Sequence, residues 1–220
     1  MLSLRLKTIE NMVDPGKIVA DIGTDHALLP VELVLSGKIK RAYAVDNKNG
    51  PFLRAQQYIQ ASGCEAMIEA MLADGLSTVP EDANCWIIAG MGFDTAILIL
   101  DQRPDVQVNQ QLIVQVNHGV DNMRKYLMNN GWQIIDERII FEAHYYQIIK
   151  ALKVKSVVRL KSEDIDFGPL LRKEKNSVFT EYWKFQIQKL QKIVNQLERG
   201  SKRGQQLQKQ INSINNMLNG

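Results

Sequence analysis

The chain has 220 residues, of which 45% are hydrophobic and 23% charged, and these proportions are typical of a soluble globular protein. Its length allows one core of ordinary size with a smaller appendage. No apolar run approaches the roughly 20 residues that a membrane span needs, and no signal-peptide pattern opens the chain. We therefore expect a cytoplasmic protein without a membrane partner.

Cysteine and histidine are too scarce and too scattered to suggest a metal site. Cys64 and Cys85 lack C-x-x-C spacing, which favours two reduced thiols in the core. His26, His118 and His144 stand far apart in the sequence. We expect no metal cofactor.

The net charge of +3 hides an asymmetry along the chain. Residues 151–220 carry 14 Lys and Arg against 6 Asp and Glu, whereas residues 1–150 carry 13 against 18. An acidic body suits a cationic ligand, and a basic tail suits a polyanion such as RNA. The alternative explanation is that the basic residues of the tail only form an ordinary solvent-exposed surface.

The first elements lead to a glycine turn. Residues 2–13 have apolar positions at helical spacing and predict a helix, on which Arg5 is either a solvated charge or a substrate contact. An apolar run over 17–20 predicts a strand, and residues 27–35 predict a second helix. A strand that turns through a glycine, here Gly23, into a helix is the first step of a nucleotide-binding α/β unit.

The turn departs from the dinucleotide pattern G-x-G-x-x-G. Asp25 stands where that pattern needs its second glycine, and the third glycine is also absent. A carboxylate would repel a pyrophosphate, but it suits the ammonium and sulfonium groups of S-adenosylmethionine (SAM). The turn therefore favours SAM over NAD. A helix N-cap is the alternative role for Asp25.

The second and third predicted strands, over 41–47 and 66–72, each end in an acid. Asp46 follows the glycine turn by about 20 residues, where a carboxylate hydrogen-bonds ribose hydroxyls. Asp74 is placed to accept a hydrogen bond from the adenine amine, which the NAD pattern does not require. An ordinary turn acid is the alternative for Asp46, and the strand–glycine–helix context favours ribose binding.

Two further strands are predicted to end at the same edge. The fourth, over 84–88, runs into a glycine loop that contains Gly90, and the fifth, over 111–117, carries Gln115 and Asn117 at its end. In open α/β sheets, ligands bind at the carboxyl ends of the strands. A tight strand–helix turn would also explain the glycines, but not their place beside the other motifs.

Two long strands, over 132–141 and 145–152, are separated only by a short turn and should pair antiparallel. Alternating strand–helix steps closed by such a hairpin predict an α/β fold of the Rossmann-like, seven-stranded SAM-methyltransferase class. We assign residues 1–160 to this domain.

Residues 161–220 are assigned to a C-terminal helical hairpin. The polar stretch 153–168 predicts a linker, and apolar residues at helical and heptad spacing then predict two helices around a turn at 200–204. The hairpin is either a structural or dimer-forming coiled coil, or an arm that grips RNA. Candidate RNA-binding residues are Arg172, Lys173, Lys175, Lys184, Lys189 and Lys192.

Several runs resemble the bacterial TrmK family of SAM-dependent tRNA (adenine-22-N1) methyltransferases. The likeness spans nearly the whole chain and is carried by these runs: Asp21-Ile22-Gly23-Thr24-Asp25-His26-Ala27, Asn49-Gly50-Pro51, Asp74-Gly75-Leu76, Ala89-Gly90-Met91-Gly92, Gly168-Pro169 and Leu170-Leu171-Arg172-Lys173-Glu174-Lys175-Asn176. Two positions depart from the family pattern. Phe93 stands where the family usually has a glycine, and Val116 stands where it usually has a proline. Both residues affect the expected shape of the pocket for the target base.

The resemblance implies SAM as cofactor, tRNA as partner and methyl transfer to N1 of adenine 22, on the D-loop side. It implies Asp25 as the catalytic carboxylate, with Asn117 orienting the base and Arg5 holding a phosphate. It implies a cofactor site built from Asp21, Gly23, Asp25, His26, Asp46, Asn47, Ala73, Asp74, Gly75, Ala89, Gly90 and Met91.

Two alternative functions stay open at this point. One is a SAM methyltransferase that acts on another RNA nitrogen or on a small molecule. The basic tail argues against a small molecule. The other is a non-catalytic RNA-binding protein of the same fold, against which the intact set of acids counts. The sequence leaves open the tRNAs recognised, the orientation of the hairpin, and the choice between monomer and dimer.

Overall fold

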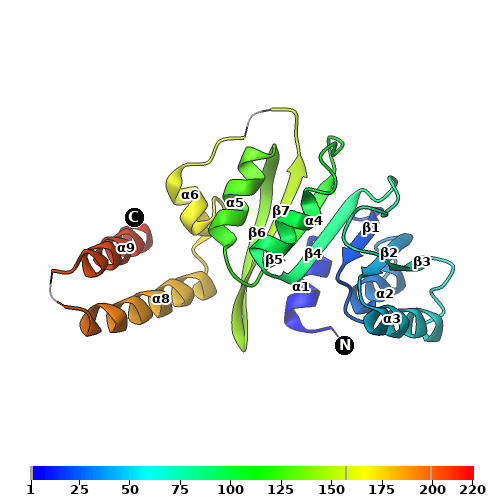
Figure 1. Ribbon diagram of the computed structural model, residues 1–220, viewed down its shortest axis with the longest axis horizontal. Coiled ribbons are helices and arrows are strands. Elements are labelled where there is room, and N and C mark those ends of the chain that lie inside the picture. The colour runs from blue at the N-terminus through cyan, green and yellow to red at the C-terminus, as the bar shows by residue number, and fades with distance from the viewer. Residues whose placement is uncertain (1, 157, 199) are drawn as a thin grey trace.

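The chain forms an α/β domain followed by two long helices that extend away from it (Figure 1). The structure, a computed structural model, describes residues 2–156, 158–198 and 200–220. No helix in these ranges is long and apolar enough to cross a membrane.

A seven-stranded sheet with the order β3-β2-β1-β4-β5-β7-β6 organises the first domain. The first five strands are parallel, and β7 pairs antiparallel with both β5 and β6. The strands are β1 (Ile18–Ile22), β2 (Arg41–Asp46), β3 (Ile68–Leu72), β4 (Cys85–Met91), β5 (Gln111–Val116), β6 (Trp132–Glu142) and β7 (His144–Lys153). This confirms the predicted fold class and the antiparallel pairing of the last two strands.

Helices cover both faces of the sheet, as the apolar spacing predicts. One buried cluster joins the sheet to α1, α2 and α3, and a second joins it to α4 and α5. Both cysteines are free and buried in the part of the chain that the structure describes. The bounds are α1 (Leu4–Met12), α2 (Leu28–Leu35), α3 (Asn49–Ala61), α4 (Phe93–Leu100) and α5 (Val120–Asn129).

The predicted linker over 153–168 is wrong in its second half. Residues Ser162–Phe167 form a helix, α6, and a four-residue helix, α7 (Leu171–Glu174), follows. Phe167 and Leu171 are 3% and 1% exposed and pack with Ile139 of β6. These isolated apolar residues anchor the segment although its composition is polar.

A buried ion pair joins this segment to the sheet domain. Arg124 of α5 donates from Nε to Glu137 Oε1 at 2.8 Å, and both side chains are fully buried. Arg124 also donates to the Ile165 carbonyl, and Glu137 accepts from the Leu170 N–H. Gly168 passes directly over the pair with φ +89°, and a Cβ there would approach Glu137 and Arg124 atoms to 2.8 Å. The pair therefore explains why glycine occupies this turn.

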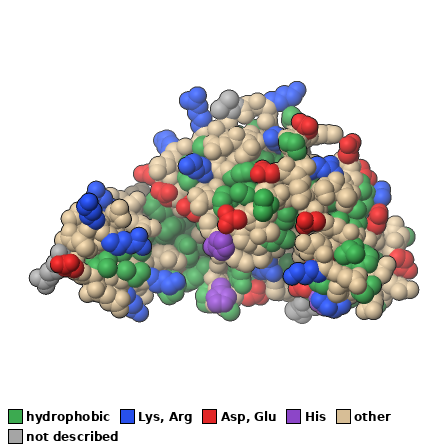
Figure 2. Space-filling view, in the orientation of Figure 1, with side chains coloured by type: hydrophobic (Ala, Val, Ile, Leu, Met, Phe, Trp, Pro, Cys, Tyr) green, Lys and Arg blue, Asp and Glu red, His purple; other side chains and the backbone are tan. Residues whose placement is uncertain are grey.

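The two long C-terminal helices, α8 (Ser177–Gln196) and α9 (Lys202–Asn219), lie side by side. Phe179, Leu207, Ile211 and Ile214 are buried between them or against the sheet domain. The predicted turn at 200–204 lies too late in the chain, because α8 ends at Gln196 and α9 begins at Lys202. Basic side chains are prominent on these helices in the surface view (Figure 2).

Candidate active site

The five parallel strands all end at one edge of the sheet, and this edge gathers most of the predicted site. The loop after β1 is tied to β2, because the N–H groups of Gly23 and Thr24 both donate to the Val45 carbonyl, at 2.8 and 3.0 Å. Gly23 has φ +73°, and a Cβ at this position would collide with the end of the Met91 side chain. The positive φ of the turn therefore favours glycine, and the flexible Met91 side chain would have to shift to admit a Cβ.

Asp21 lies at the base of this loop and is 7% exposed. Its Oδ2 accepts a hydrogen bond from Thr24 Oγ1 at 2.7 Å. Burial raises the pKa of the Asp21 carboxyl to about 6, while the Thr24 hydroxyl and the Arg5 charge oppose the rise. A carboxyl group with such a pKa can lose its proton when a cationic ligand binds beside it, because the cation favours the ionised form.

The ends of β2 and β3 are joined through their polar side chains. Asp46 Oδ1 accepts from the Lys48 N–H at 2.8 Å, and Asn47 Nδ2 donates to Asp74 Oδ1 at 3.1 Å. The Ala73 N–H donates to the Asp46 carbonyl at 3.0 Å. The two carboxylates predicted to bind ribose and adenine therefore stand on neighbouring strand ends, each held by one local donor.

The ends of β4 and β5 are joined by a hydrogen-bonded network that reaches α1. Gln115 Oε1 accepts from both the Gly90 N–H and Arg5 Nη1, each at 3.0 Å. Gln115 Nε2 donates to Asn117 Oδ1 at 3.1 Å, and Asn117 Nδ2 donates to the Gly90 carbonyl at 2.8 Å. The Arg5 guanidinium also stacks over the Tyr146 ring, 5.7 Å from its centre. Arg5, Gly90 and Asn117 therefore form one unit.

Asp25 projects from the loop with 69% of its side chain exposed. Its Oδ1 lies 3.5 Å from His26 Nε2. The residue at the N-cap of α2 is Ala27, and no side-chain hydrogen bond caps this helix. The capping role for Asp25 is therefore absent from the described structure, and its carboxylate is open to solvent.

The residues present suit SAM. The carboxyl groups of Asp21, Asp46 and Asp74 offer acceptors for cationic and hydroxyl groups, and Gly23 and Gly90 with φ of +73° and +80° keep backbone close to a ligand. Within the described ranges, no cluster of three or more His, Cys, Asp or Glu could hold a metal ion.

The predicted RNA-binding residues lie outside the sheet, on α7, α8 and the turn between them. Arg172 is engaged by Asp164 at 2.7 Å and Glu163 at 3.0 Å, so it fastens α7 to α6. Lys173, Lys184, Lys189 and Lys192 are exposed, and Lys175 is partly exposed. Lys189 shares a groove with Asn117, which brings the helical arm next to the strand ends.

Sequence reasoning missed Thr24 and the aromatic residues around that groove. Thr24 sits inside the glycine turn as an ordinary small residue, and its tie to Asp21 shows only in three dimensions. Phe141 and Tyr145 lie in predicted strands, so their sequence predicts core packing, and Phe185 stands outside the apolar stripe of α8. Their exposure distinguishes them: Phe141 and Phe185 are 53% and 42% exposed.

Comparisons with known proteins agree with this geometry. A family model described as tRNA (adenine(22)-N(1))-methyltransferase matches residues 19–216. The Bacillus subtilis (strain 168) protein of that name is 33% identical over 215 residues, covering 94% of this chain and 90% of the relative.

Two solved structures extend the similarity to the whole chain. Mycoplasma capricolum TrmK in complex with S-adenosyl-homocysteine has a TM-score of 0.88 and 32% identity, covering 100% of this chain and 98% of that one. A Streptococcus pneumoniae structure in complex with S-adenosyl-L-methionine has a TM-score of 0.87 and 33% identity, covering 99% and 100%. With a family model and a curated relative both matching most of its length, the chain belongs to the tRNA (adenine(22)-N(1))-methyltransferase family, TrmK.

Proposed function

We propose that this protein transfers the methyl group of SAM to N1 of adenine 22 in tRNA, in the cytoplasm. The observation that carries the proposal is the gathering of Asp21, Asp25, Asp46, Asp74 and Asn117 at one strand edge in a chain of this family. When bound, SAM supplies an electrophilic methyl group on a sulfonium.

The cofactor is held by groups on four strand ends. Asp46 binds the ribose hydroxyls through the oxygen that Lys48 leaves free, and Asp74 accepts from the adenine amine. Asp21 takes the cationic amino-acid end, and the backbone at Gly23 and Gly90 lies close against the cofactor. His26, Asn47, Ala73, Gly75, Ala89 and Met91 complete the lining that we propose.

The target adenine meets Asp25 and Asn117. Its N1 carries an in-plane lone pair that would attack the methyl group as the bond from that methyl group to the sulfonium sulfur breaks and S-adenosyl-homocysteine leaves, so positioning of the base dominates the rate. Positive charge builds on the base as the methyl group arrives, and a fixed carboxylate near its Watson–Crick edge stabilises that charge. Asn117, oriented by Gln115, holds the base, and Arg5 contacts a phosphate. Because a duplex hides this edge, the adenine must be unpaired or flipped out.

The C-terminal unit, residues 161–220, supplies tRNA affinity in this proposal. Its exposed lysines on α8 interact with the phosphate backbone, and the seam between α8 and α9 packs as a coiled coil. Arg172 is the weakest candidate contact, since Asp164 and Glu163 already engage it.

Substitution of the two strand-end acids tests the cofactor assignment. Asp46→Ala and Asp74→Ala each remove a charge-assisted hydrogen bond and should weaken SAM binding by about 1.5–3 kcal/mol. Calorimetry with SAM, and transfer of labelled methyl to unmodified tRNA at rising SAM concentration, measure this. Asp94→Ala, an exposed acid in the first turn of α4, is the matched control. Unchanged SAM affinity in both folded variants would reject the assignment.

A further inference from the structure

A groove of about 620 Å³ runs from the end of β5 to the side of α8. The β6–β7 hairpin forms one wall with Phe141, His144 and Tyr145, and α8 forms the other with Phe185 and Lys189. Asn117, which we place beside the target adenine, lines the same groove. Hydrophobic side chains fill the hollow between the arm and the body in the surface view (Figure 2).

We propose that this groove binds an unstacked nucleotide of the tRNA that neighbours the methylated adenine, with its base against the aromatic rings and its phosphate near Lys189. The inference rests on the proposed function and adds a second nucleotide subsite to it.

The aromatic rings pack together as one cluster with tilted planes. The ring of Tyr145 lies at the centre, with its centroid 4.8 Å from that of Phe141, 5.2 Å from Tyr182 and 6.0 Å from Phe185. Phe141 and Phe185 keep about half of their surface open to solvent, although their neighbours hold them in place. Rigid aromatic faces next to a cation are what single-stranded nucleic acids use for base stacking.

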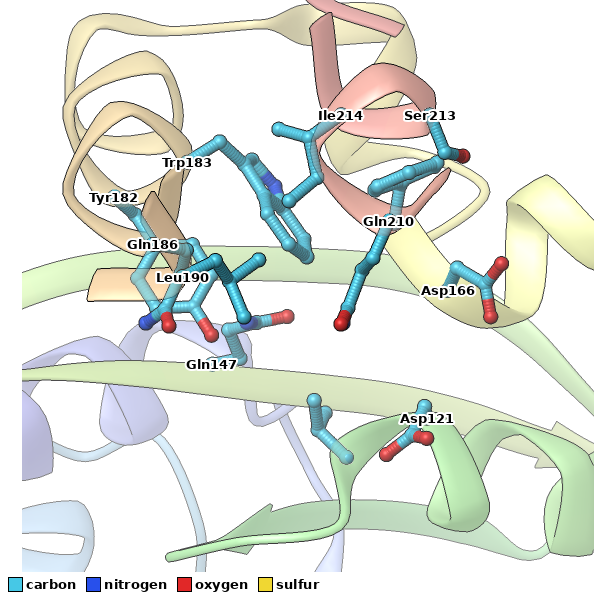
Figure 3. Close-up of a pocket in the computed structure, with 12 residues that line it drawn as sticks. Asp121, Gln147, Asp166, Tyr182, Trp183, Gln186, Leu190, Gln210, Ser213 and Ile214 are labelled. Atoms are coloured by element: carbon cyan, nitrogen blue, oxygen red, sulfur yellow. The ribbon is translucent and has the colours of Figure 1, made fainter. Parts of the chain in front are cut away.

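Charge favours a nucleotide over other occupants. Lys189 Nζ lies 4.9 Å from the centre of the Phe185 ring, and no Asp or Glu is among the described residues that line the groove. The neighbouring cavity, about 320 Å³ between the sheet domain and α8–α9, differs. It is lined by Asp121 and Asp166 on the side away from Gln147 (Figure 3). Those acids would repel a phosphate, so a nucleotide should bind in the groove rather than in this cavity.

The groove is also fixed relative to the catalytic edge. At the tip of the β6–β7 hairpin, Glu142 accepts hydrogen bonds from the Leu4 and Arg5 N–H groups, at 2.7 and 3.1 Å. Arg5 in turn reaches Gln115, and Gln115 reaches Asn117. These hydrogen bonds fix the position of Phe141 relative to Asn117. A base stacked on Phe141 and a base held at Asn117 are therefore positioned together, which favours the conformation in which the target adenine is flipped out.

The test compares Phe141→Ala and Phe185→Ala with Phe185→Tyr, which keeps a ring. Leu98→Ala is the matched control, because Leu98 is 67% exposed on α4, outside the groove. The readouts are affinity for unmodified tRNA, SAM affinity, single-turnover methylation, and fluorescence of tRNA with 2-aminopurine next to adenine 22. Thermal melting confirms that each variant is folded.

We expect each alanine variant to bind tRNA about 5-fold to 150-fold more weakly, with SAM affinity unchanged. Phe185→Tyr and Leu98→Ala should behave as wild type, and quenching of 2-aminopurine should be abolished only in the alanine variants. Wild-type tRNA affinity and quenching in both alanine variants would overturn the subsite.

A self-association change without a tRNA effect, seen by sedimentation, would assign the groove to a second copy of the chain and also overturn the proposal. Failure of the proposed function is distinguishable, because the wild-type protein itself would then leave tRNA unmethylated.

Discussion

At the end of β1, the Asp21 carboxyl is only 7% exposed, and its pKa of about 6 makes both stability and cofactor binding depend on pH. Between pH 3.8 and about 6, the folded protein holds a proton on Asp21 that the unfolded chain releases. This contribution to the free energy of unfolding is therefore present at low pH and is lost as pH rises through that window.

Cofactor binding should follow the opposite trend. If Asp21 faces the cationic end of SAM, only its ionised form attracts the ligand, so affinity should rise as pH increases from about 5 to 7. Asp21→Asn keeps an acceptor for Thr24 but cannot ionise. We expect it to bind SAM weakly with a flattened pH profile, while its stability at pH 7 is equal to or above that of the wild type. Calorimetry in buffers of different ionisation enthalpy measures the proton release; identical pH profiles for the two proteins would contradict the contact.

Asp25 is exposed and caps no helix, so its charge is dispensable for folding. Asp25→Asn should leave thermal stability unchanged and reduce single-turnover methylation by about two orders of magnitude, because the developing charge on adenine is then left without its partner. Asp94→Asn, which removes the charge of an exposed acid on α4, is the matched control and should methylate tRNA at the wild-type rate. A folded Asp25→Asn protein that methylates tRNA at the original rate would rule out the catalytic role.

At the scale of elements, α8 presents exposed lysines on the surface of the arm, and electrostatic attraction predicts their effect. Replacing Lys184 and Lys192 of α8, together with Lys173 of the adjoining α7, with Gln removes up to three ionic interactions with tRNA phosphates. The slope of log affinity against log salt should flatten by about 0.7–0.9 for each phosphate that is no longer neutralised.

The control for this experiment is Lys40→Gln, an exposed lysine of the sheet domain. SAM affinity should be the same in every variant. Parallel salt dependences for the triple variant and the wild type would mean that α8 is only a packing element.

The elements themselves were largely predictable, because strand and helix periodicity is local. Runs such as 111–117 and 132–141 need only their own residues to show a strand. The helix over Ser162–Phe167 was not predictable, since one buried phenylalanine in a polar stretch shows no helical spacing of apolar residues. Arg124 resembles a surface charge on an amphipathic helix, and its buried partner Glu137 lies on another element.

The site was predictable to the extent that strand ends meet at one edge. Asp46 and Asp74 follow directly from that rule and from their place in the chain. Cross-element contacts such as Arg5 with Gln115, or the groove that Lys189 shares with Asn117, could not be predicted, because they join residues more than 70 positions apart. The structure also shows that the Asp25 side chain does not cap α2, an alternative that the sequence had left open.

At the scale of the whole molecule, an acidic sheet domain that binds a cationic cofactor carries a basic arm, and an aromatic groove without acidic side chains among its described lining residues connects them. This arrangement fits the proposed reaction on one base of a folded tRNA. A small-molecule methyltransferase would have no use for the arm, and a passive RNA-binding protein would have no use for the acids at the strand ends.

Incubation of the full chain with labelled SAM and two unmodified tRNA transcripts, one with adenine and one with guanine at position 22, tests this directly. Mass spectrometry of the digested nucleosides identifies the product. We predict 1-methyladenosine from the adenine-22 transcript and no label in the guanine-22 transcript. Equal labelling of both transcripts, or a methylated nucleoside other than 1-methyladenosine, would contradict the account.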